Sequence, residues 1–250
     1  MNEKQTKIAL ITGANRGIGY AIAKGLLNAD FQVIIGSRSL EKGKAAVEKL
    51  NSAIGQAELD SASLALNSSS VSAVEIDIAK DDSINNAFNE LKGKIDRLDV
   101  LINNAGIYPD NGFNILTIDR DLLIKTLNIN TFGAIKTTQI FLPLLEKADE
   151  ARVINYSSGY GQLAGLSAGV PSYCLSKLAV NGATIMLADA LFGKNITVNA
   201  VDPGWVSSDM GGENAPRTTE QGADAAVWLA TIDSVKDSGK LWRDRSIVSY

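Results

Sequence analysis

The sequence predicts an α/β protein: a doubly wound, mostly parallel sheet with helices on both faces, forming a single domain over residues 1–250. Short apolar runs alternate along the chain with longer segments of helical periodicity. Such runs match strands that are buried on both faces, as in parallel sheets covered by helices. No linker or repeat divides the 250 residues, and their 45% apolar content is enough for one large core.

The elements can be assigned in chain order. We expect strands at residues 8–11, 33–35, 74–76, 100–102, 153–154 and 197–201, and the clearest helices at residues 17–27, 84–91 and 122–142. Residues 51–70, rich in Ser and Ala, form a surface insertion that either extends the preceding helix or stays flexible. Ligands of such folds bind at the carboxyl ends of the strands, so chemistry is expected there.

Composition excludes several classes of function. The net charge is −4 without a basic stripe, which argues against nucleic acid and anionic membranes as partners and favours a small molecule. Apolar runs stay short of the roughly 18 residues of a membrane span, and no signal peptide is recognisable, so we expect a cytoplasmic protein.

The acid–base repertoire is narrow. The chain has no histidine and one cysteine, Cys174, which excludes an internal disulfide, Cys-cluster or His-based metal sites and His-dependent hydrolases. No metal is therefore expected. Tyrosine, lysine and carboxylates remain for proton transfer, and Cys174 is interpreted as a small helical residue.

A glycine-rich turn follows the first expected strand. Gly13, Gly17 and Gly19 stand in Thr-Gly-Ala-Asn-Arg-Gly-Ile-Gly, directly before a helix. Glycines let the backbone approach a pyrophosphate, and the helix N-terminus offers free N–H groups to it. A purely structural turn is the alternative, but this position in an α/β chain predicts a dinucleotide site.

Two arginines indicate which dinucleotide binds. Sites for NAD carry an acidic residue after the second strand, whereas this chain has Arg38 there and Arg16 in the glycine turn. Guanidinium groups suit the 2′-phosphate of NADP(H), unless both arginines are only solvated surface residues. Asp77, after the third strand, is placed to accept from the adenine amino group; its alternative is an ordinary loop or cap aspartate.

Tyr173 and Lys177 form a candidate proton donor and its tuner. Four residues apart on an expected helix, they share one face, and a nearby ammonium is expected to lower the pKa of the phenol. Tyr20 and Lys24 have the same spacing, but Tyr20 follows the glycine turn, whereas Tyr173 lies downstream of Ser158 at the end of an apolar strand.

These motifs, in order with Asn103-Asn104-Ala105-Gly106 and Asp202-Pro203-Gly204-Trp205-Val206, resemble those of the short-chain dehydrogenase/reductases over nearly the whole chain. The resemblance implies a Rossmann-like fold. Within the family the chain is most similar to the NADPH-dependent carbonyl reductases. It lacks the long segment that these enzymes often carry before the catalytic tyrosine, so their monomeric state and substrate range do not transfer.

The resemblance implies a catalytic set of Asn130, Ser158, Tyr173 and Lys177. Ser158 would bind the substrate carbonyl and Tyr173 would protonate its oxygen. Lys177 would lower the pKa of Tyr173 and hold the nicotinamide ribose, while Asn130 would anchor a water that relays protons. Ser157 is the competing serine; strand alternation allows only one of the pair to face the substrate.

The implied binding residues fall into two groups. Trp205, Tyr160 and Ser158 are expected to line the substrate pocket, which suits a hydrophobic ketone or aldehyde. The expected contacts of NADP(H) are Gly13, Asn15, Arg16, Gly17, Ile18, Gly19, Arg38, Asp77, Ile78, Asn104, Ala105, Gly106, Tyr173, Lys177, Pro203, Gly204, Val206 and Ser208.

Two functions are consistent with these motifs. The first is an NADPH-dependent oxidoreductase that reduces a ketone or aldehyde carbonyl to an alcohol by hydride transfer, with tyrosine as the proton donor. The alternative is a non-catalytic NADP(H)-binding regulatory protein on the same fold. Substrate identity, stereochemistry, physiological direction and oligomeric state, a homo-oligomer included, stay open.

Overall fold

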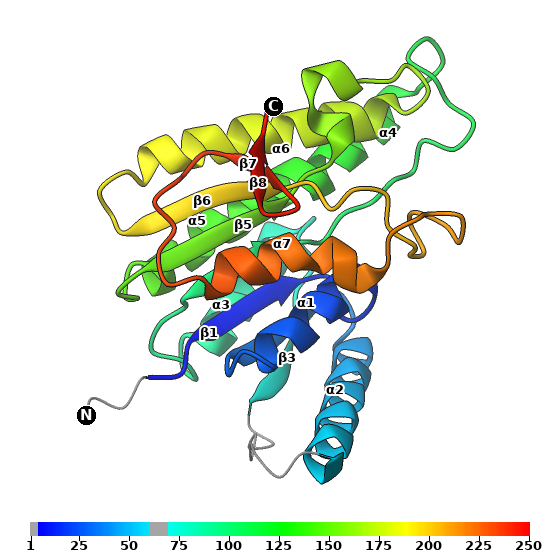
Figure 1. The fold of residues 1–250 in the computed structure, drawn as a ribbon. Helices are drawn as coiled ribbons and strands as arrows, with labels where there is room; N and C mark the ends of the chain where they lie inside the picture. Colours follow the sequence, from blue (N-terminus) through cyan, green and yellow to red (C-terminus); the bar gives the residue numbers. More distant parts are fainter. Residues whose placement is uncertain (1–4, 61–69) are drawn as a thin grey trace.

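An eight-stranded sheet runs through the molecule in the order β3-β2-β1-β4-β5-β6-β7-β8 (Figure 1). The computed structural model describes residues 5–60 and 70–250. Its first six strands are parallel and overlap the predicted ranges: β1 Ile8–Thr12, β2 Gln32–Ser37, β3 Val71–Glu75, β4 Val100–Asn103, β5 Ala151–Tyr156 and β6 Ile196–Val201. The strand order reverses at β1 and β4, where such sheets open a crevice.

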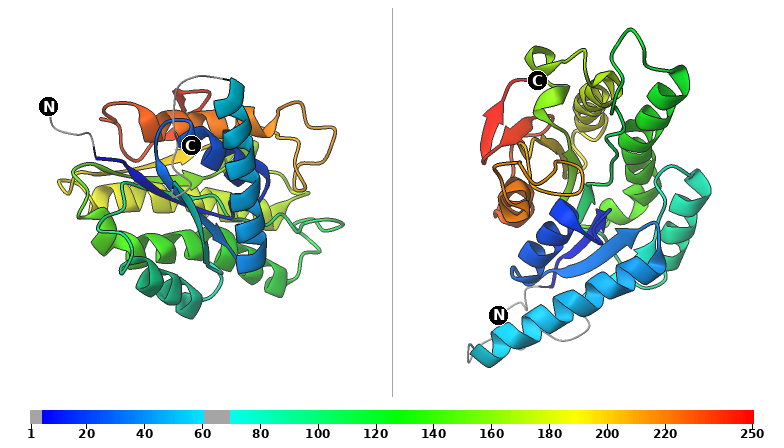
Figure 2. Two further views of the ribbon diagram at one scale, coloured as in Figure 1. Left: turned by 90° about the horizontal axis from the view of Figure 1, so that it is seen from below. Right: turned by 90° about the vertical axis from the view of Figure 1, so that its right-hand side faces the viewer.

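Helices cover both faces of the sheet, as predicted (Figure 2). The helices α1 Gly17–Leu27, α2 Leu40–Asp60 and α7 Thr219–Thr231 bury Leu26, Leu50 and Leu229 against one face. On the other face, α3 Asp81–Leu91 and α5 Gly133–Leu145 bury Ile84 and Phe141, and α6 Pro171–Ala190 packs its partly buried Leu187 against the same core. The predicted doubly wound α/β fold is confirmed. No helix among the described residues is long and apolar enough to cross a membrane.

The helix predicted over residues 122–142 is interrupted. It consists of α4 Arg120–Leu127, a π-helical turn η1 Asn128–Phe132, and α5. The turn buries Asn130 and Thr131, whose side chains bond to Ser176 on α6. One extra residue per turn re-aims side chains, and π-turns of this kind are frequent at functional sites.

One predicted strand has different bounds in the structure, and one predicted segment lies partly outside the described residues. The strand expected at residues 74–76 begins earlier, at Val71, and ends at Glu75. The surface insertion predicted at residues 51–70 stays a prediction: α2 includes residues 51–60, and residues 61–69 lie outside the described residues.

The hairpin of β7 Leu241–Arg243 and β8 Ser246–Val248 was not predicted. Its turn places Asp244 at φ 48° and Arg245 at φ 62°, a conformation usually signalled by Asn-Gly or Asp-Gly. Ion pairs of Asp244 with Arg217, and of Arg245 with Asp224, stabilise the turn from outside. The sequence therefore carries no local signal for it.

A buried row of polar side chains joins the sheet to α5 and α6. Asn103 Nδ2 donates to Thr138 Oγ1 on α5 at 3.1 Å and to Asn155 Oδ1 at 2.8 Å. Asn155 Nδ2 continues the row to Thr184 Oγ1 on α6 at 3.0 Å. Directional bonds of this kind fix the position of a helix more tightly than apolar contact alone.

We predict that Asn155→Val lowers the free energy of unfolding by about 1–3 kcal/mol, because it leaves a buried donor of Asn103 without its acceptor and Thr184 without its donor. Urea denaturation measures this change. Thr197→Val, on the neighbouring strand β6, is the control and should change stability by less than about 0.5 kcal/mol. Equal effects of the two substitutions would contradict the role given to the row.

Candidate active site

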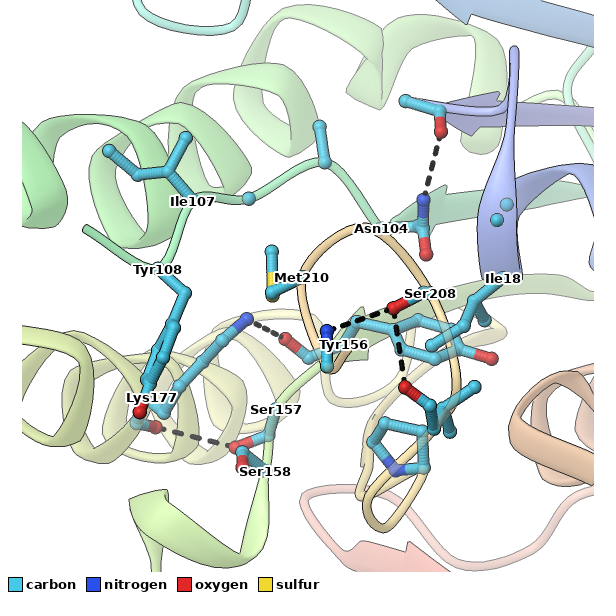
Figure 3. A pocket seen from close by; sticks show the side chains of 18 of the residues that line it. Ile18, Asn104, Ile107, Tyr108, Tyr156, Ser157, Ser158, Lys177, Ser208 and Met210 are labelled. Carbon is cyan, nitrogen blue, oxygen red and sulfur yellow. Dashed lines mark hydrogen bonds between the residues drawn. The ribbon is translucent and has the colours of Figure 1, made fainter. Parts of the chain in front are cut away.

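A cleft of about 970 Å³ opens at the carboxyl ends of the central strands (Figure 3). Its wall includes all of the cofactor contacts and all of the substrate-pocket residues predicted from the sequence. Of the predicted catalytic set, Ser158, Tyr173 and Lys177 line it, whereas Asn130 does not. The fold thus brings together residues from the ends of six strands and from α6.

The glycine turn is pressed against the end of β4. Gly13 has φ +68°, and a Cβ there would lie 2.9 Å from Ala105 Cα, so both its conformation and the close approach require glycine. The backbone N–H groups of Asn104 and Ala105 donate to Thr12 Oγ1, each at 3.1 Å. Asn104 Nδ2 donates to Thr12 O at 3.0 Å. The amide of Asn104 therefore shapes the turn.

The N-terminus of α1 is suited to an anion. Arg16, its N-cap residue, makes no side-chain cap, and the first turn contains no acidic residue. N–H groups at such a terminus attract phosphate. Arg38 is exposed on the cleft wall and makes no ion pair within the described chain, while Arg16 contacts Asp209, a residue the sequence analysis did not single out.

Asp77 lies on the cleft wall but also serves its own turn. Its Oδ1 accepts from Ala79 N at 3.1 Å, and its N–H donates to Ser83 Oγ at 2.9 Å. Lys80 Nζ lies 3.8 Å from the second carboxylate oxygen. This geometry agrees with the cap interpretation, while the residue also lines the cleft.

Tyr173 projects from the first turn of α6 between two other aromatic rings. The ring centroid of Tyr108 lies 4.8 Å away and that of Tyr160 6.2 Å away, both nearly perpendicular to the phenol. Edge-to-face packing of this kind holds a ring in one orientation. Tyr108, which the sequence analysis missed, follows the Asn-Asn-Ala-Gly motif by two residues.

Lys177 lies one turn farther along α6 and is 5% exposed. Its Nζ donates to Tyr156 O at 2.7 Å (Figure 3). The same Nζ lies 5.5 Å from the ring centroid of Tyr173. The lysine thus ties α6 to the end of β5 and sets a cation beside the phenol.

The two adjacent serines after β5 face opposite ways. Ser157 Oγ donates to Asn181 Oδ1 at 2.6 Å inside the protein. Ser158 is half-buried on the cleft wall, where its Oγ accepts from Tyr160 N at 3.2 Å and lies beside the phenol of Tyr173. Gly161 lets this segment touch α6, since a Cβ there would lie 2.7 Å from the carbonyl carbon of Lys177. Ser158 is therefore the serine whose hydroxyl lies on the cleft wall near Tyr173.

Burial acts oppositely on the two titratable groups. It raises the pKa of the Tyr173 phenol, with the nearby Ser158 hydroxyl opposing and the Asp202 carboxylate adding to the rise. It lowers the pKa of Lys177 to about 8. Loss of solvent is the largest influence on the phenol, and the net direction of its pKa is opposite to the lowering expected from Lys177.

Asn130 sits one layer behind the cleft. Its Oδ1 accepts from Ile107 N at 2.8 Å, and its Nδ2 donates to Ile107 O at 2.9 Å and to Ser176 Oγ at 3.0 Å. Both polar atoms of the amide therefore help to fix the segment after β4 to α6. Asn130 does not line the cleft, and its role in anchoring a water stays a prediction.

The segment after β6 closes the far wall. Val206 is buried near Ile18 and Gly222, and Pro203 and Gly204 form the turn before it. Ser208 Oγ is engaged locally, donating to Val206 O at 3.3 Å and accepting from Gly211 N at 3.2 Å. Trp205 is exposed on the rim, where its indole N–H donates to Gly211 O.

Several wall residues escaped the sequence analysis. Asp202 is buried; its Oδ1 accepts from Gly204 N at 2.9 Å, and its Oδ2 has Arg243 Nη1 at 3.4 Å without a hydrogen bond in the described chain. Arg243 comes from the unpredicted strand β7. Met210 and Asp209 come from the loop after β6. An acid at the end of β6 was the one available signal, within the Asp-Pro-Gly motif.

Comparisons with known proteins agree with this geometry. Residues 7–219 match the short chain dehydrogenase family. A short-chain dehydrogenase of Penicillium roqueforti is 33% identical over 96% of this chain and 94% of its own. The carbonyl reductase Sniffer of D. melanogaster superposes with a TM-score of 0.83 at 30% identity, covering 98% of this chain and 100% of that one. An NADPH-bound carbonyl reductase from chicken fatty liver has a TM-score of 0.84 and 26% identity, with the same coverage.

We predict that Lys177→Met removes a pH dependence of stability. The pKa of Lys177 is about 8 in the folded protein and 10.5 for an ordinary lysine. Between pH 8 and pH 10.5, the unfolded chain therefore holds a proton on this lysine that the folded protein lacks. Lysine 177 therefore destabilises the wild type by about 3 kcal/mol below pH 8, and this penalty fades as pH rises to 10.5.

The measurement is the difference in free energy of unfolding between variant and wild type at pH 7 and pH 10. The difference should favour the variant more at pH 7. Lys24→Met, on the exposed face of α1, is the matched control and should give one value at both pH values. A difference for Lys177→Met that did not change with pH would refute the buried cation.

Proposed function

The chain belongs to the short-chain dehydrogenase family, a family of oxidoreductases acting on small molecules, and on that premise we propose that it is an NADPH-dependent reductase of ketones or aldehydes. One observation carries the proposal: Ser158, Tyr173 and Lys177 meet on the wall of the same cleft that begins at the glycine turn. A phosphate seat and an acid–base pair in one cleft suit hydride transfer to a carbonyl.

The cleft has groups for each part of NADPH. The glycine turn and the N-terminus of α1 would hold the pyrophosphate. Arg38 and Arg16 would hold the 2′-phosphate, and an NADPH-bound carbonyl reductase among the similar structures supports that choice. Asp77 and Ile78 would flank the adenine, Asn104, Ala105 and Gly106 the ribose, and Pro203, Gly204, Val206 and Ser208 the nicotinamide end.

When bound, NADPH supplies the hydride that forms the new C–H bond and is itself oxidised to NADP⁺ as the carbonyl becomes an alcohol. Ser158 donates a hydrogen bond to the carbonyl oxygen and orients it. Tyr173 gives its phenolic proton to that oxygen, becomes phenolate, and regains a proton from solvent. A raised pKa keeps the phenol protonated at neutral pH, and the alkoxide that would otherwise form is a far stronger base.

Lys177 assists at the moment when charge develops. Its ammonium, 5.5 Å from the ring centroid of Tyr173, attracts the phenolate much more than the neutral phenol. Preorganised charge of this kind acts on the transition state rather than on the ground state. Asn130 contributes from behind, in this proposal, by clamping Ile107.

The substrate end of the cleft is aromatic. Tyr108, Tyr160, Trp205 and Met210 line it, and the last three are exposed at its rim. Walls of this kind bind apolar groups and offer few partners to hydroxyl groups. We therefore propose a hydrophobic ketone or aldehyde as substrate. NADPH oxidation measured against ketones, aldehydes and quinones tests this, and tight NADPH binding without any turnover would favour the regulatory alternative.

The first prediction from this proposal concerns the cofactor. Arg38→Asp should weaken NADPH binding about 10- to 100-fold relative to NADH, because it removes charge-assisted bonds to the 2′-phosphate and adds repulsion. Fluorescence titration with both nucleotides measures the ratio. Lys44→Asp, an equal change of charge on the exposed surface of α2, should leave the ratio unchanged. Equal affinity of the wild type for NADPH and NADH would rule the assignment out.

The second prediction concerns the proton donor. Tyr173→Phe should lower kcat by at least about 100-fold while leaving the Kd of NADPH nearly intact, because it removes only the acid. Tyr20→Phe is the control: Tyr20 also precedes a lysine by four residues, but it packs with the core outside the cleft and should keep its turnover. Wild-type turnover in Tyr173→Phe would show that another group donates the proton.

A further inference from the structure

The helix that carries Tyr173 begins without a local cap. Val170, the N-cap residue of α6, makes no side-chain hydrogen bond, and Pro171 follows it. Pro171 has no N–H, so Ser172 and Tyr173 carry the first free N–H groups of the helix. Both residues are at the cleft end of α6, where those groups need partners inside the protein.

The partners come from a carboxylate far away in the sequence. Asp110, in the loop between β4 and α4, is 2% exposed. Its Oδ1 accepts from Ser172 N at 2.8 Å, and its Oδ2 accepts from Tyr173 N at 3.0 Å and from Ser172 Oγ at 2.9 Å. Ser172 Oγ extends the contact to Thr126 Oγ1 on α4 at 3.0 Å. The carboxylate thus binds the backbone of the candidate catalytic residue itself.

Both the charge and the shape of this carboxylate matter. Two oxygens that only accept match two N–H groups and a hydroxyl, and negative charge is favoured at a helix N-terminus. An amide in the same place would offer one acceptor and turn a donor toward another donor. An apolar residue would leave the buried N–H groups of the first turn unpaired.

The same residue fastens the loop that faces Tyr173. This loop is held at Ile107 by Asn130 and at Asp110 by α6. Tyr108 lies between these two points, with its ring centroid 4.8 Å from that of Tyr173. Asp110 therefore sets both the first turn of α6 and the aromatic wall against which the phenol rests.

We infer that Asp110 is a positioning residue for the reaction: its carboxylate holds the first turn of α6, and with it Tyr173, where the phenol can meet a carbonyl oxygen. The inference rests on the proposed function. It differs from electrostatic tuning, since the bonds of Asp110 go to the backbone and to Ser172. Displacing a reacting group by about 1 Å lowers a rate by roughly 100-fold.

The test combines kinetics with amide hydrogen exchange. Asp110→Asn should lower kcat about 10- to 100-fold while the Kd of NADPH changes less than about twofold. Exchange at the amides of Ser172 and Tyr173 should become about tenfold faster, with the rest of α6 unchanged. Asp110→Glu, which keeps the carboxylate, should recover part of kcat. Ser172→Ala, which keeps both backbone bonds, should lose less than about threefold.

Asp99→Asn is the matched control. Asp99 is another buried carboxylate that accepts a distant backbone N–H, that of Ile8 at 2.7 Å, but it lies at the amino end of β4, away from the strand ends that form the cleft. This variant should lower the melting temperature and keep kcat. The inference is overturned if Asp110→Asn keeps wild-type kcat, or if its kcat falls no more than that of Asp99→Asn.

Exchange separates a failure of this inference from a failure of the proposed function. If the wild type reduced no carbonyl compound, the proposed function would fail. The exchange rates would then be the test of whether Asp110 holds the first turn of α6. Fast exchange confined to the first turn in Asp110→Asn would support it. Unchanged exchange there would overturn it.

Discussion

The seating of α6 on the sheet through buried polar bonds is the constraint on which the site depends. A helix held by apolar packing can rotate or slide by fractions of an ångström at little cost. Two side chains of α6 donate hydrogen bonds to backbone carbonyl groups, Lys177 to Tyr156 O and Asn181 to Gly161 O. A third, Thr184, accepts a hydrogen bond from the side-chain amide of Asn155 on β5. These directional bonds set the rotation of the helix. These bonds therefore hold Tyr173 on the wall of the cleft that also contains the glycine turn.

Burial beside the cleft affects the protonation of Tyr173 and of Lys177 differently. Tyr173 is kept protonated, as an acid must be before it acts. Lys177 has a pKa of about 8 and so stays largely charged at neutral pH, in a place where a cation is costly until an anion forms nearby. The fold thus holds a cation whose attraction is realised when the phenol gives up its proton. Stability given up at functional positions is a common trade in enzymes.

The fold could be predicted from the sequence, because the spacing of apolar residues and the length of apolar runs directly reflect which faces of helices and strands are buried. It also placed the strand-end motifs in one cleft, since parallel strands bring their carboxyl ends to one edge. It could not find the β7–β8 hairpin, whose turn at Asp244 is stabilised by ion pairs from other segments. Nor could it find Asp110 or the bonds of the Asn130 amide to Ile107, because tertiary contacts decide both. The direction of the Tyr173 pKa could not be predicted either. The spacing of two residues indicates that they are close, but burial, which raises this pKa, depends on the tertiary structure.

A crystal structure of the protein with NADP⁺ tests the central claim most directly, namely that one cleft holds the cofactor against Tyr173. The account predicts the 2′-phosphate beside Arg38, the pyrophosphate at the first turn of α1, and the nicotinamide between Val206 and the phenol of Tyr173, with Ser158 on the open side. A nucleotide bound outside the cleft, or one inside it with the nicotinamide directed away from Tyr173, would contradict the account.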